Sequence, residues 1–366
     1  MKKELKLSKT NTLINLANSV LKHYGLTTFH ESNKVFDNLF KNHKKIAIVL
    51  LDGFGKAILE NYKNDVPFMY EHRYKVINST FPPTTVAATT ALQTGKYPIE
   101  TGYLGWVEFF TKYNDYIETF TNSYRRDKAH KTDEIITKSI LKVTTISDLL
   151  NKKYGNNFST EVHSFSFNKG EEEANQSVVF NAFNNAIKNH TFTYCYDVEP
   201  DHTMHHEGVN NEIVRKDVIN LSNHLEKLIN DNKDTLFIVL SDHGMKDVEY
   251  ININTIPNFV DSLEDKTINL ESRFASFKIK DKQKFIKSYE ENLKNYFCLY
   301  SKEEILKTHL FGYGKPCQIA LDCIGDYILI AKDKYCLLDD NGQVLNGNHA
   351  GSTKEETQIY TQVYNK

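Results

Sequence analysis

Two short apolar runs constrain the fold of this chain more than any other feature of its sequence. They cover residues 45–51 and 235–240, and each stops abruptly at polar turn residues. Such runs are typical of strands buried on both faces of a parallel sheet. A third run, 191–196, has the same character, and helical patterns separate the runs at 86–92, 145–150 and 213–229. This alternation predicts an α/β sheet with helices on both faces.

Acidic and histidine side chains cluster where the predicted strands end. Ligands of such sheets bind outside the carboxyl ends of the strands, so these side chains are candidates for a site. Asp and His are the mixed oxygen and nitrogen donors that borderline divalent ions accept, zinc best, and manganese or iron also. Two such ions need about six protein ligands if each keeps one position open for substrate. Six candidates are present: Asp52, Asp201, His205, Asp242, His243 and His349.

Each candidate, taken singly, also has an ordinary structural role open to it. Asp52 or Asp201 can cap a helix, and His349 can be a loop histidine without a metal. The occurrence of all six at strand ends or in adjacent loops is what favours a metal site. His202 and His206 lie close by in the sequence, and we expect them beside the ligands or at the surface.

The segment 81–95, FPPTTVAATTALQTG, contains the candidate nucleophile. Its prolines predict an extended approach and its small residues a helix, which places a threonine in the first helical turn. There the backbone amides and the positive end of the helix dipole favour an anion. A threonine hydroxyl becomes a good nucleophile only when its pKa is lowered, for example by a metal. Four threonines compete, and a helix cap is the alternative role for the first two: Thr84, Thr85, Thr89 and Thr90.

The texture of the sequence changes between residues 258 and 334. Residues 273–279 alternate like a half-exposed strand, and residues 282–296 have the pattern of a charged helix. Ser301 and Glu304 form a capping box that starts another helix. We expect residues 258–334 to form a small α+β insertion laid over the main sheet.

The rest of the chain, 1–257 and 335–366, is predicted to form the catalytic core, with residues 1–44 as a helical segment packed on it. An amphipathic helix is expected there, because apolar residues recur at helical spacing. They are Leu13, Ile14, Leu16, Ala17, Val20 and Leu21. The same segment lacks the apolar stretch of a signal peptide, and no run reaches the roughly 20 apolar residues of a membrane span.

The composition mainly argues against certain partners and against cysteine-based sites. The formal net charge is −2 and the isoelectric point about 6.7, so nothing global favours a nucleic-acid polymer or an anionic membrane as partner. The five cysteines include no CxxC pair, which argues against a disulfide framework or a Cys-based zinc site and fits a reducing compartment. We therefore expect a cytoplasmic protein. The sequence specifies no oligomeric state.

Taken in order, these motifs resemble the alkaline phosphatase superfamily, specifically the bacterial branch of its type I phosphodiesterase/nucleotide pyrophosphatase family. That family has an Asp after the first strand, matched in IVLLDGFG, and a nucleophilic Thr nine residues before a Thr-Gly, which is Thr85. EPDxxxH matches Glu199 to His205, SDHGM matches 241–245, and a late His-x-Gly begins at His349. The resemblance implies an alkaline-phosphatase-like, mostly parallel mixed sheet with helices on both faces and a small inserted α+β subdomain.

The resemblance also implies a reaction. One metal would be held by Asp201, His205 and His349, and the other by Asp52, Asp242 and His243, with Thr85 as its fourth ligand. The ions would be Zn²⁺, with Mn²⁺ as the alternative. Thr85 would attack phosphorus in line, and water would hydrolyse the resulting phosphothreonine, with the two metals roughly 4 Å apart. The implied substrate is a small-molecule phosphodiester or a phosphoanhydride such as a nucleotide.

One position departs from the family pattern. Nucleotide pyrophosphatases of the family place an Asn, whose amide binds a phosphoryl oxygen, twenty-one residues after the Thr, and here that position is Trp106. Trp106 can donate one N–H, stack on a base or aromatic leaving group, or pack in the core. Tyr103 and Phe109 can join it in an aromatic platform, and both are equally well placed to be core residues.

Other functions stay open at this point. A phosphomonoesterase or phosphonate hydrolase would use the same core, but a monoester carries an extra negative charge and calls for a basic residue near Thr85. Lys96, the nearest in sequence, is expected to be solvated at a helix end, so the sequence favours diesters. A non-catalytic binding protein is less favoured, because degenerate relatives usually lose one or more ligands and none is missing here.

Overall fold

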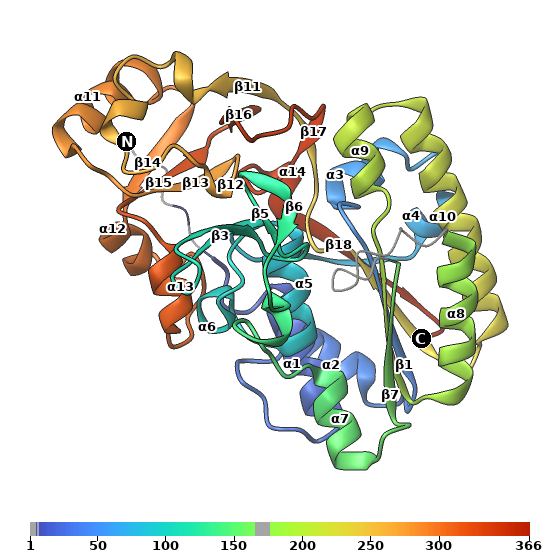
Figure 1. Cartoon of the computed structure of the whole chain (residues 1–366). Coiled ribbons are helices and arrows are strands. Elements are labelled where there is room, and N and C mark those ends of the chain that lie inside the picture. Colours follow the sequence, from blue (N-terminus) through green and yellow to red (C-terminus); the bar gives the residue numbers. More distant parts are fainter. Residues whose placement is uncertain (1–4, 6, 165–175) are drawn as a thin grey trace.

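The computed structural model describes residues 5, 7–164 and 176–366, and in this part of the chain a mixed sheet of six strands lies at the centre (Figure 1). The strand order is β2 (Arg73–Asn78), β18 (Gln358–Tyr364), β9 (Leu236–Leu240), β1 (Ile46–Leu51), β8 (Phe192–Asp197) and β7 (Ser159–His163). β1 pairs in parallel with β8 and β9, and β7 runs parallel to β8. β18 is antiparallel to both of its neighbours, which makes the sheet mixed, as predicted.

The three apolar runs of the sequence are confirmed as the central strands β1, β8 and β9. Every residue of β1 is buried because alternate side chains feed two different hydrophobic cores. Ile46, Ile48 and Leu50 face one core, and Ala47, Val49 and Leu51 face the other. A strand with a core on each side has no solvent face, so its sequence shows no polar alternation.

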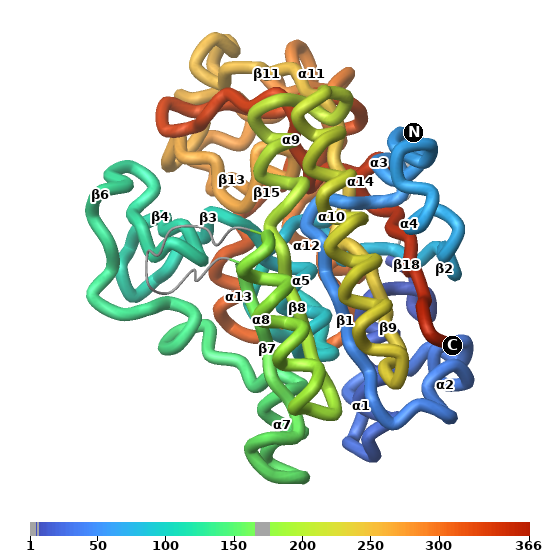
Figure 2. The backbone as a smooth tube through the Cα atoms, turned by 90° about the vertical axis from the view of Figure 1, so that its right-hand side faces the viewer, coloured from blue at the N-terminus to red at the C-terminus, as the bar shows by residue number. Residues whose placement is uncertain are grey.

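Helices cover both faces of this sheet, as predicted. The core on one face includes side chains of α1 (Leu13–His23), α2 (Lys34–Phe40), α5 (Thr85–Thr94) and α7 (Ile146–Tyr154). The core on the other includes those of α3 (Lys56–Asn61), α4 (Pro67–Glu71), α8 (Gln176–Asn189) and α10 (Glu212–Asp231). Figure 2 shows α8 and α10 in front of the strands on this second face.

The amphipathic N-terminal helix predicted from the sequence is present as α1, but polar residues of this helix are buried as well. Its predicted apolar positions are buried, but so are Asn15, Asn18 and Ser19. Asn18 Nδ2 donates to the carbonyl of Gly95, just after α5, at 2.8 Å, and Ser19 Oγ donates to the carbonyl of Asn15 at 3.1 Å. The polar side chains can be buried because hydrogen bonds satisfy them, and the helix is enclosed rather than half exposed.

A second sheet of eight strands lies beside the first. All of its pairings are antiparallel. Its order is β14 (Phe297–Ser301), β15 (Tyr327–Ala331), β13 (Phe274–Phe277), β12 (Asn269–Glu271), β3 (Val107–Phe110), β4 (Asp115–Glu118), β5 (Ser123–Tyr124) and β6 (Asp127–Lys131). The division of the chain into a core and an insertion at 258–334 stays a prediction, and this sheet also takes strands from 107–131.

Within 258–334 the helix predictions are largely confirmed. α11 (Lys282–Asn292) lies in the expected charged segment, and α12 (Lys302–Lys307) begins with the predicted capping box of Ser301 and Glu304. The strand predicted at 273–279 is present as β13, but its predicted half-exposure is wrong, because all four residues of β13 are buried. β13 lies between β12 and β15, and its side chains join cores on both sides of the sheet.

The remaining described elements are short. Two-stranded sheets join β10 (Lys246–Asp247) to β17 (Gly347–Asn348) and β11 (Glu249–Asn252) to β16 (Tyr335–Leu338). The short helices are α6 (Pro98–Thr101), α9 (Asp201–Glu207), α13 (Gln318–Cys323) and α14 (Lys354–Thr357), with single 3₁₀ turns at Ile136–Lys138, Ile253–Thr255 and Val260–Ser262. Among the described residues, no helix has both the length and the apolar character needed to cross a membrane.

Candidate active site

The predicted site residues come together at one edge of the central sheet. Asp52 directly follows β1, and Asp242 lies two residues after the end of β9. Asp201 is the first residue of α9, which follows β8. The three strands are parallel neighbours, so their carboxyl ends meet at the same edge. His349 reaches this edge from the segment that follows β17.

Asp201, His205 and His349 form the first of two clusters. One ligand atom from each lies within 4.8 Å of the others. His205 Nε2 is 3.2 Å from Asp201 Oδ2, because a spacing of four residues places both side chains on one side of α9. His349 Nε2 is 3.9 Å from the other oxygen of Asp201. His205 Nδ1 lies 2.9 Å from the carbonyl of Gly347, which orients the ring and leaves Nε2 facing the cluster.

Asp52, Asp242 and His243 form the second cluster, and the side chains are at most 1% exposed. His243 Nε2 lies 3.3 Å from Asp52 Oδ1 and 3.5 Å from Asp242 Oδ2. The two clusters touch, since the rings of His243 and His349 stack with centroids 3.9 Å apart. The structure therefore groups all six predicted ligands into the two sets of three that the resemblance implies.

The donor chemistry of the clusters fits divalent cations. Each cluster offers carboxylate oxygens and imidazole nitrogens, the donors that zinc and manganese accept. Among the described residues, Asp201 Oδ1 and Asp242 Oδ2 are buried without a hydrogen-bond partner. A buried carboxylate oxygen is costly unless a donor or a cation satisfies it. A bound cation would satisfy one such oxygen in each cluster.

The pKa shifts in the clusters follow from burial and crowding. Burial, followed by the charges of Asp242 and Asp201, raises the pKa of Asp52 well above its usual value. Burial also acts on Asp201, but the nearby His205 outweighs it and lowers the pKa of that carboxyl. For His349, burial and then the charge of His243 lower the pKa well below its usual value, so the ring is neutral. A neutral imidazole is the form that binds a metal.

Thr85 is the threonine that reaches the second cluster. It is the first residue of α5, and its Oγ1 lies 3.4 Å from Asp52 Oδ1 and 3.1 Å from His243 Nε2. The competing hydroxyls have other partners, since Thr84 donates to Glu271 Oε1 at 2.6 Å and Thr89 donates to the carbonyl of Thr85 at 2.6 Å. Thr90 is buried and does not line the cavity, so of the four threonines only Thr85 contacts a cluster.

A buried ion pair between Arg273 and Glu356 contacts two of the loops at the site. Both side chains are fully buried, and Arg273 donates to the two carboxylate oxygens of Glu356 at 2.7 and 2.9 Å. Glu356 Oε1 also accepts from the N–H of Gly351, in the loop of His349, at 2.7 Å. The backbone carbonyl of Glu356 accepts from the N–H of Gly244, in the loop after β9, at 2.9 Å. One ion pair thus joins two of the loops that carry candidate ligands.

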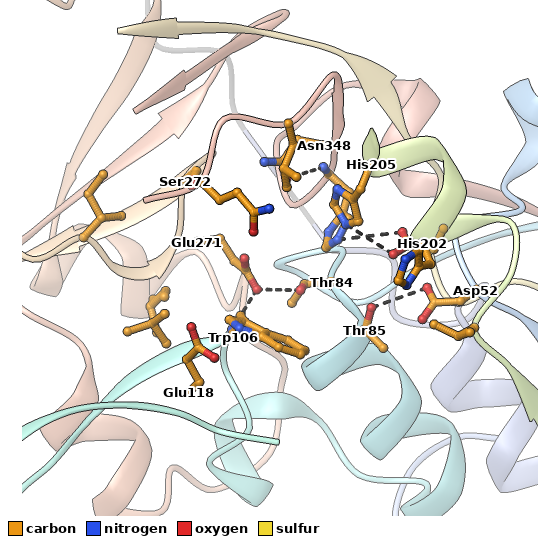
Figure 3. A pocket seen from close by; sticks show the side chains of 18 of the residues that line it. Asp52, Thr84, Thr85, Trp106, Glu118, His202, His205, Glu271, Ser272 and Asn348 are labelled. Carbon is orange, nitrogen blue, oxygen red and sulfur yellow. Dashed lines mark hydrogen bonds and ion pairs between the residues drawn. The ribbon is translucent and has the colours of Figure 1, made fainter. Parts of the chain in front are cut away.

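A cavity of about 540 Å³ opens from the clusters toward the second sheet. Thr85, Asp52 and His205 lie on one side of it and Trp106 on the other (Figure 3). Exposed His202 and His206 also line it, beside the ligands, as predicted.

Of the three aromatic residues considered for a platform, only Trp106 lines the cavity. Tyr103 is buried with its hydroxyl 2.8 Å from the carbonyl of Leu141, and Phe109 packs under Lys278 with 3.8 Å between Nζ and the ring centroid. Lys96 does not line the cavity either.

Two residues that contact the site, Tyr196 and Glu271, were not predicted from the sequence. Tyr196, at the end of β8, donates its hydroxyl to Asp52 Oδ2, and its position one residue before a strand-end Asp was the available signal. Glu271 comes from β12 and accepts hydrogen bonds from the hydroxyl of Thr84 and, at 2.8 Å, from the backbone N–H of Trp106. Burial raises the pKa of Glu271. No local pattern pointed to it, because it reaches the site only through pairing within the second sheet.

Comparison with known families decides the classification. The model of the type I phosphodiesterase/nucleotide pyrophosphatase family matches residues 46–355. The chain belongs to this family. As a type I phosphodiesterase/nucleotide pyrophosphatase, it is a hydrolase of a metal-dependent family. The bacterial branch stays a prediction, and no curated protein matches the sequence.

Solved structures of the same superfamily share the fold. Murine ectonucleotide pyrophosphatase/phosphodiesterase 5 is 19% identical with a TM-score of 0.64, and the match covers 87% of this chain and 88% of that one. The human protein of the same name is also 19% identical with a TM-score of 0.64, and the match covers 87% of each chain. An inactive threonine-to-alanine variant of the murine protein, in complex with AMP, is 20% identical with a TM-score of 0.64 and 88% coverage of both chains. At this identity the likeness shows the fold.

Proposed function

We propose that this phosphodiesterase/nucleotide pyrophosphatase hydrolyses a phosphodiester or phosphoanhydride through a covalent phosphothreonine at Thr85, beside a two-metal site. The observation that carries the proposal is the position of Thr85 Oγ1, 3.4 Å from Asp52 and 3.1 Å from His243, at the start of a helix. No other threonine considered from the sequence contacts a candidate metal cluster.

The two clusters would hold one divalent cation each. Asp201, His205 and His349 would bind one, and Asp52, Asp242 and His243 the other, with Zn²⁺ as the expected ion and Mn²⁺ as the alternative. Bound there, such ions would supply Lewis-acid stabilisation of phosphoryl oxygens and lower the pKa of a coordinated hydroxyl or water.

The chain's own residues account for attack and positioning. The hydroxyl proton of Thr85 passes to solvent as its oxygen bonds to phosphorus, and the bond between phosphorus and the leaving oxygen breaks. A water oxygen then bonds to phosphorus and gives up a proton, while the bond between phosphorus and Thr85 breaks and the Thr85 oxygen regains a proton. The phosphate product then leaves. The N-terminus of α5 favours the negative charge of the phosphoryl group during both steps.

The proposed substrate is a nucleotide or a related phosphoric ester. The complex of the murine variant with AMP supports this choice. Trp106 lines the cavity, where its ring offers a surface on which a base or an aromatic leaving group can stack. The expected cytoplasmic location and the identity of the metal stay predictions.

A phosphomonoesterase remains the alternative, and the cavity lining disfavours it. A dianionic phosphoryl group calls for basic side chains near the nucleophile, whereas Glu271 is bonded to Thr84, next to Thr85. A direct test compares p-nitrophenol release from the bis-ester and the mono-ester of p-nitrophenyl phosphate. Faster hydrolysis of the bis-ester is expected, and faster hydrolysis of the mono-ester would favour the alternative.

Replacing the nucleophile tests the mechanism. Thr85→Ala should reduce turnover of the bis-ester by about 10³-fold or more, because none of the other threonines considered contacts a cluster, and metal content should stay nearly intact. Thr84→Ala is the matched control and should retain turnover within about tenfold. Acid-quenched protein analysed by mass spectrometry should carry a phosphate on Thr85. An active Thr85→Ala together with an inactive Thr84→Ala would contradict the assignment.

A further inference from the structure

The cavity continues past Trp106, away from Thr85, to a wall formed by the second sheet. Figure 3 shows Glu118 on the far side of Trp106 from Thr85. Val107 lines this part of the cavity between its strand neighbours Leu270 and Glu118. Ile268, Arg125 and Lys128 also line the cavity. Among the described residues that line the cavity, Arg125 and Lys128 are the only lysine or arginine side chains.

Arg125 lies in the turn between β5 and β6 and is only 11% exposed. Its Nη1 is 3.4 Å from Glu118 Oε1 and its Nη2 is 3.6 Å from Asp339 Oδ1. Its Nε is buried without a hydrogen-bond partner in the described part of the chain. A guanidinium has five N–H donors, and these long contacts leave donors for an anionic ligand.

Lys128 adds a second positive charge to the same wall. Its Nζ lies 3.3 Å from Glu118 Oε1, and its side chain is 52% exposed. Asp339 is not part of the lining, and its oxygens accept from the backbone N–H groups of Ile268 and Asn341 at 2.8 and 3.1 Å. Two cations therefore line this end of the cavity beside one lining carboxylate, Glu118, whereas the second carboxylate near Arg125, Asp339, lies outside the lining.

We propose that this end of the cavity binds a second phosphate of the substrate, one that is not hydrolysed. The inference rests on the proposed function, since Thr85 must hold the reacting phosphorus at the other end. Arg binds phosphate through paired N–H donors, and Lys binds it as a compact charge. The apolar stretch between the two ends, with Trp106, fits a planar base. The substrate class is a nucleotide ester or anhydride with phosphates on both sides of the nucleoside.

Two chromophoric esters test this inference. One is the p-nitrophenyl ester of thymidine 5′-phosphate, and the other is the same ester with an added 3′-phosphate, so the reacting phosphorus and leaving group are identical. The metal-loaded protein should show the lower KM for the ester with the second phosphate. Lys128→Ala and Arg125→Gln should each raise that KM about tenfold or more, with kcat unchanged and the other ester affected less than about twofold.

Lys131→Ala is the matched control, because Lys131 lies on the same strand, is exposed and does not line the cavity. Its KM for both esters should be unchanged. Lys128 is also exposed, so its variant tests the inference even if Arg125→Gln fails to fold. The preference for the second phosphate should shrink as ionic strength rises.

Equal KM values for the two esters in the unmodified protein, or an equal rise for both in Lys128→Ala, would overturn the inference. Calorimetric binding of thymidine 3′,5′-bisphosphate and thymidine 5′-phosphate makes the same comparison without turnover. Failure to hydrolyse either ester would count against the proposed function, whereas equal binding of these two nucleotides would count against the second phosphate site alone.

Discussion

Asp52 is the side chain on which the contacts of the site converge. Its Oδ2 accepts a hydrogen bond from Tyr196, and its Oδ1 lies close to Thr85 Oγ1 and His243 Nε2. Burial is the main reason that its pKa is raised, and the hydrogen bond from Tyr196 opposes that rise. Tyr196 therefore favours the charged form of Asp52, which is the form that binds a cation.

Tyr196→Phe should weaken metal binding about 10- to 100-fold, because it removes the donor that orients Asp52 and stabilises its charge. The measurement is calorimetric titration of the metal-free protein with Zn²⁺. Tyr194→Phe is the matched control, since Tyr194 lies on the same strand and its buried hydroxyl makes no hydrogen bond within the described residues. Equal zinc affinity in Tyr196→Phe and the unmodified protein would contradict the role given to this hydroxyl.

Glu108 is a buried acid away from the clusters whose ionisation should affect stability. Its Oε1 accepts from the backbone N–H groups of Leu104 and Gly105 at 2.7 and 3.1 Å, and its Oε2 has no hydrogen-bond partner in the described structure. Burial raises its pKa from 4.5 to about 8. Between these values the unfolded chain has lost the proton that the folded protein keeps, so stability falls as pH rises.

The free energy of unfolding should therefore lose up to about 1.4 kcal/mol per pH unit from this group across that window. Glu108→Gln keeps the shape and the hydrogen bonds but cannot ionise, so its stability should fall less with pH. Urea unfolding of both proteins at several pH values checks this. Parallel pH profiles for the two proteins would show that Glu108 does not titrate as described.

At the scale of elements, the sequence predicted the strands and helices that depend on neighbouring residues. The apolar runs, the helix that begins at Thr85 and the capping box at Ser301 all depend on neighbouring residues, and the structure has each of them. The polar side chains buried in α1 and the fully buried β13 could not be predicted, because distant segments enclose them. Glu271 was missed for the same reason.

At the same scale, the buried pair of Arg273 and Glu356 connects the second sheet to the two loops that carry the candidate ligands His243 and His349. Glu356→Ala would leave a fully buried guanidinium without its partner and should lower the free energy of unfolding by about 3–5 kcal/mol. Glu303→Ala is the control, since its pair with Lys307 is about three-quarters exposed and its loss should hardly change the free energy of unfolding. Urea unfolding measures both, and similar small changes in the two variants would contradict the role given to the buried pair.

At the scale of the whole molecule, the candidate metal ligands and the opposite wall of the cavity belong to different sheets. The central sheet supplies Asp52, Asp242 and the strand that leads to Asp201, as its parallel pattern predicted. Glu271 lies in β12 of the second sheet, and Trp106 directly precedes β3 of the same sheet, far away in sequence. Local pattern could identify the first group of residues, whereas the second depends on long-range antiparallel pairing that no single segment encodes.

The two-metal site beside Thr85 is the central claim, and anomalous scattering from crystals grown with Zn²⁺ tests it most directly. Two peaks are expected roughly 4 Å apart, one bound by Asp201, His205 and His349 and the other by Asp52, Asp242 and His243, with Thr85 Oγ1 beside the second. A map in which one or both clusters lack a peak would contradict the account, and so would peaks bound by other side chains.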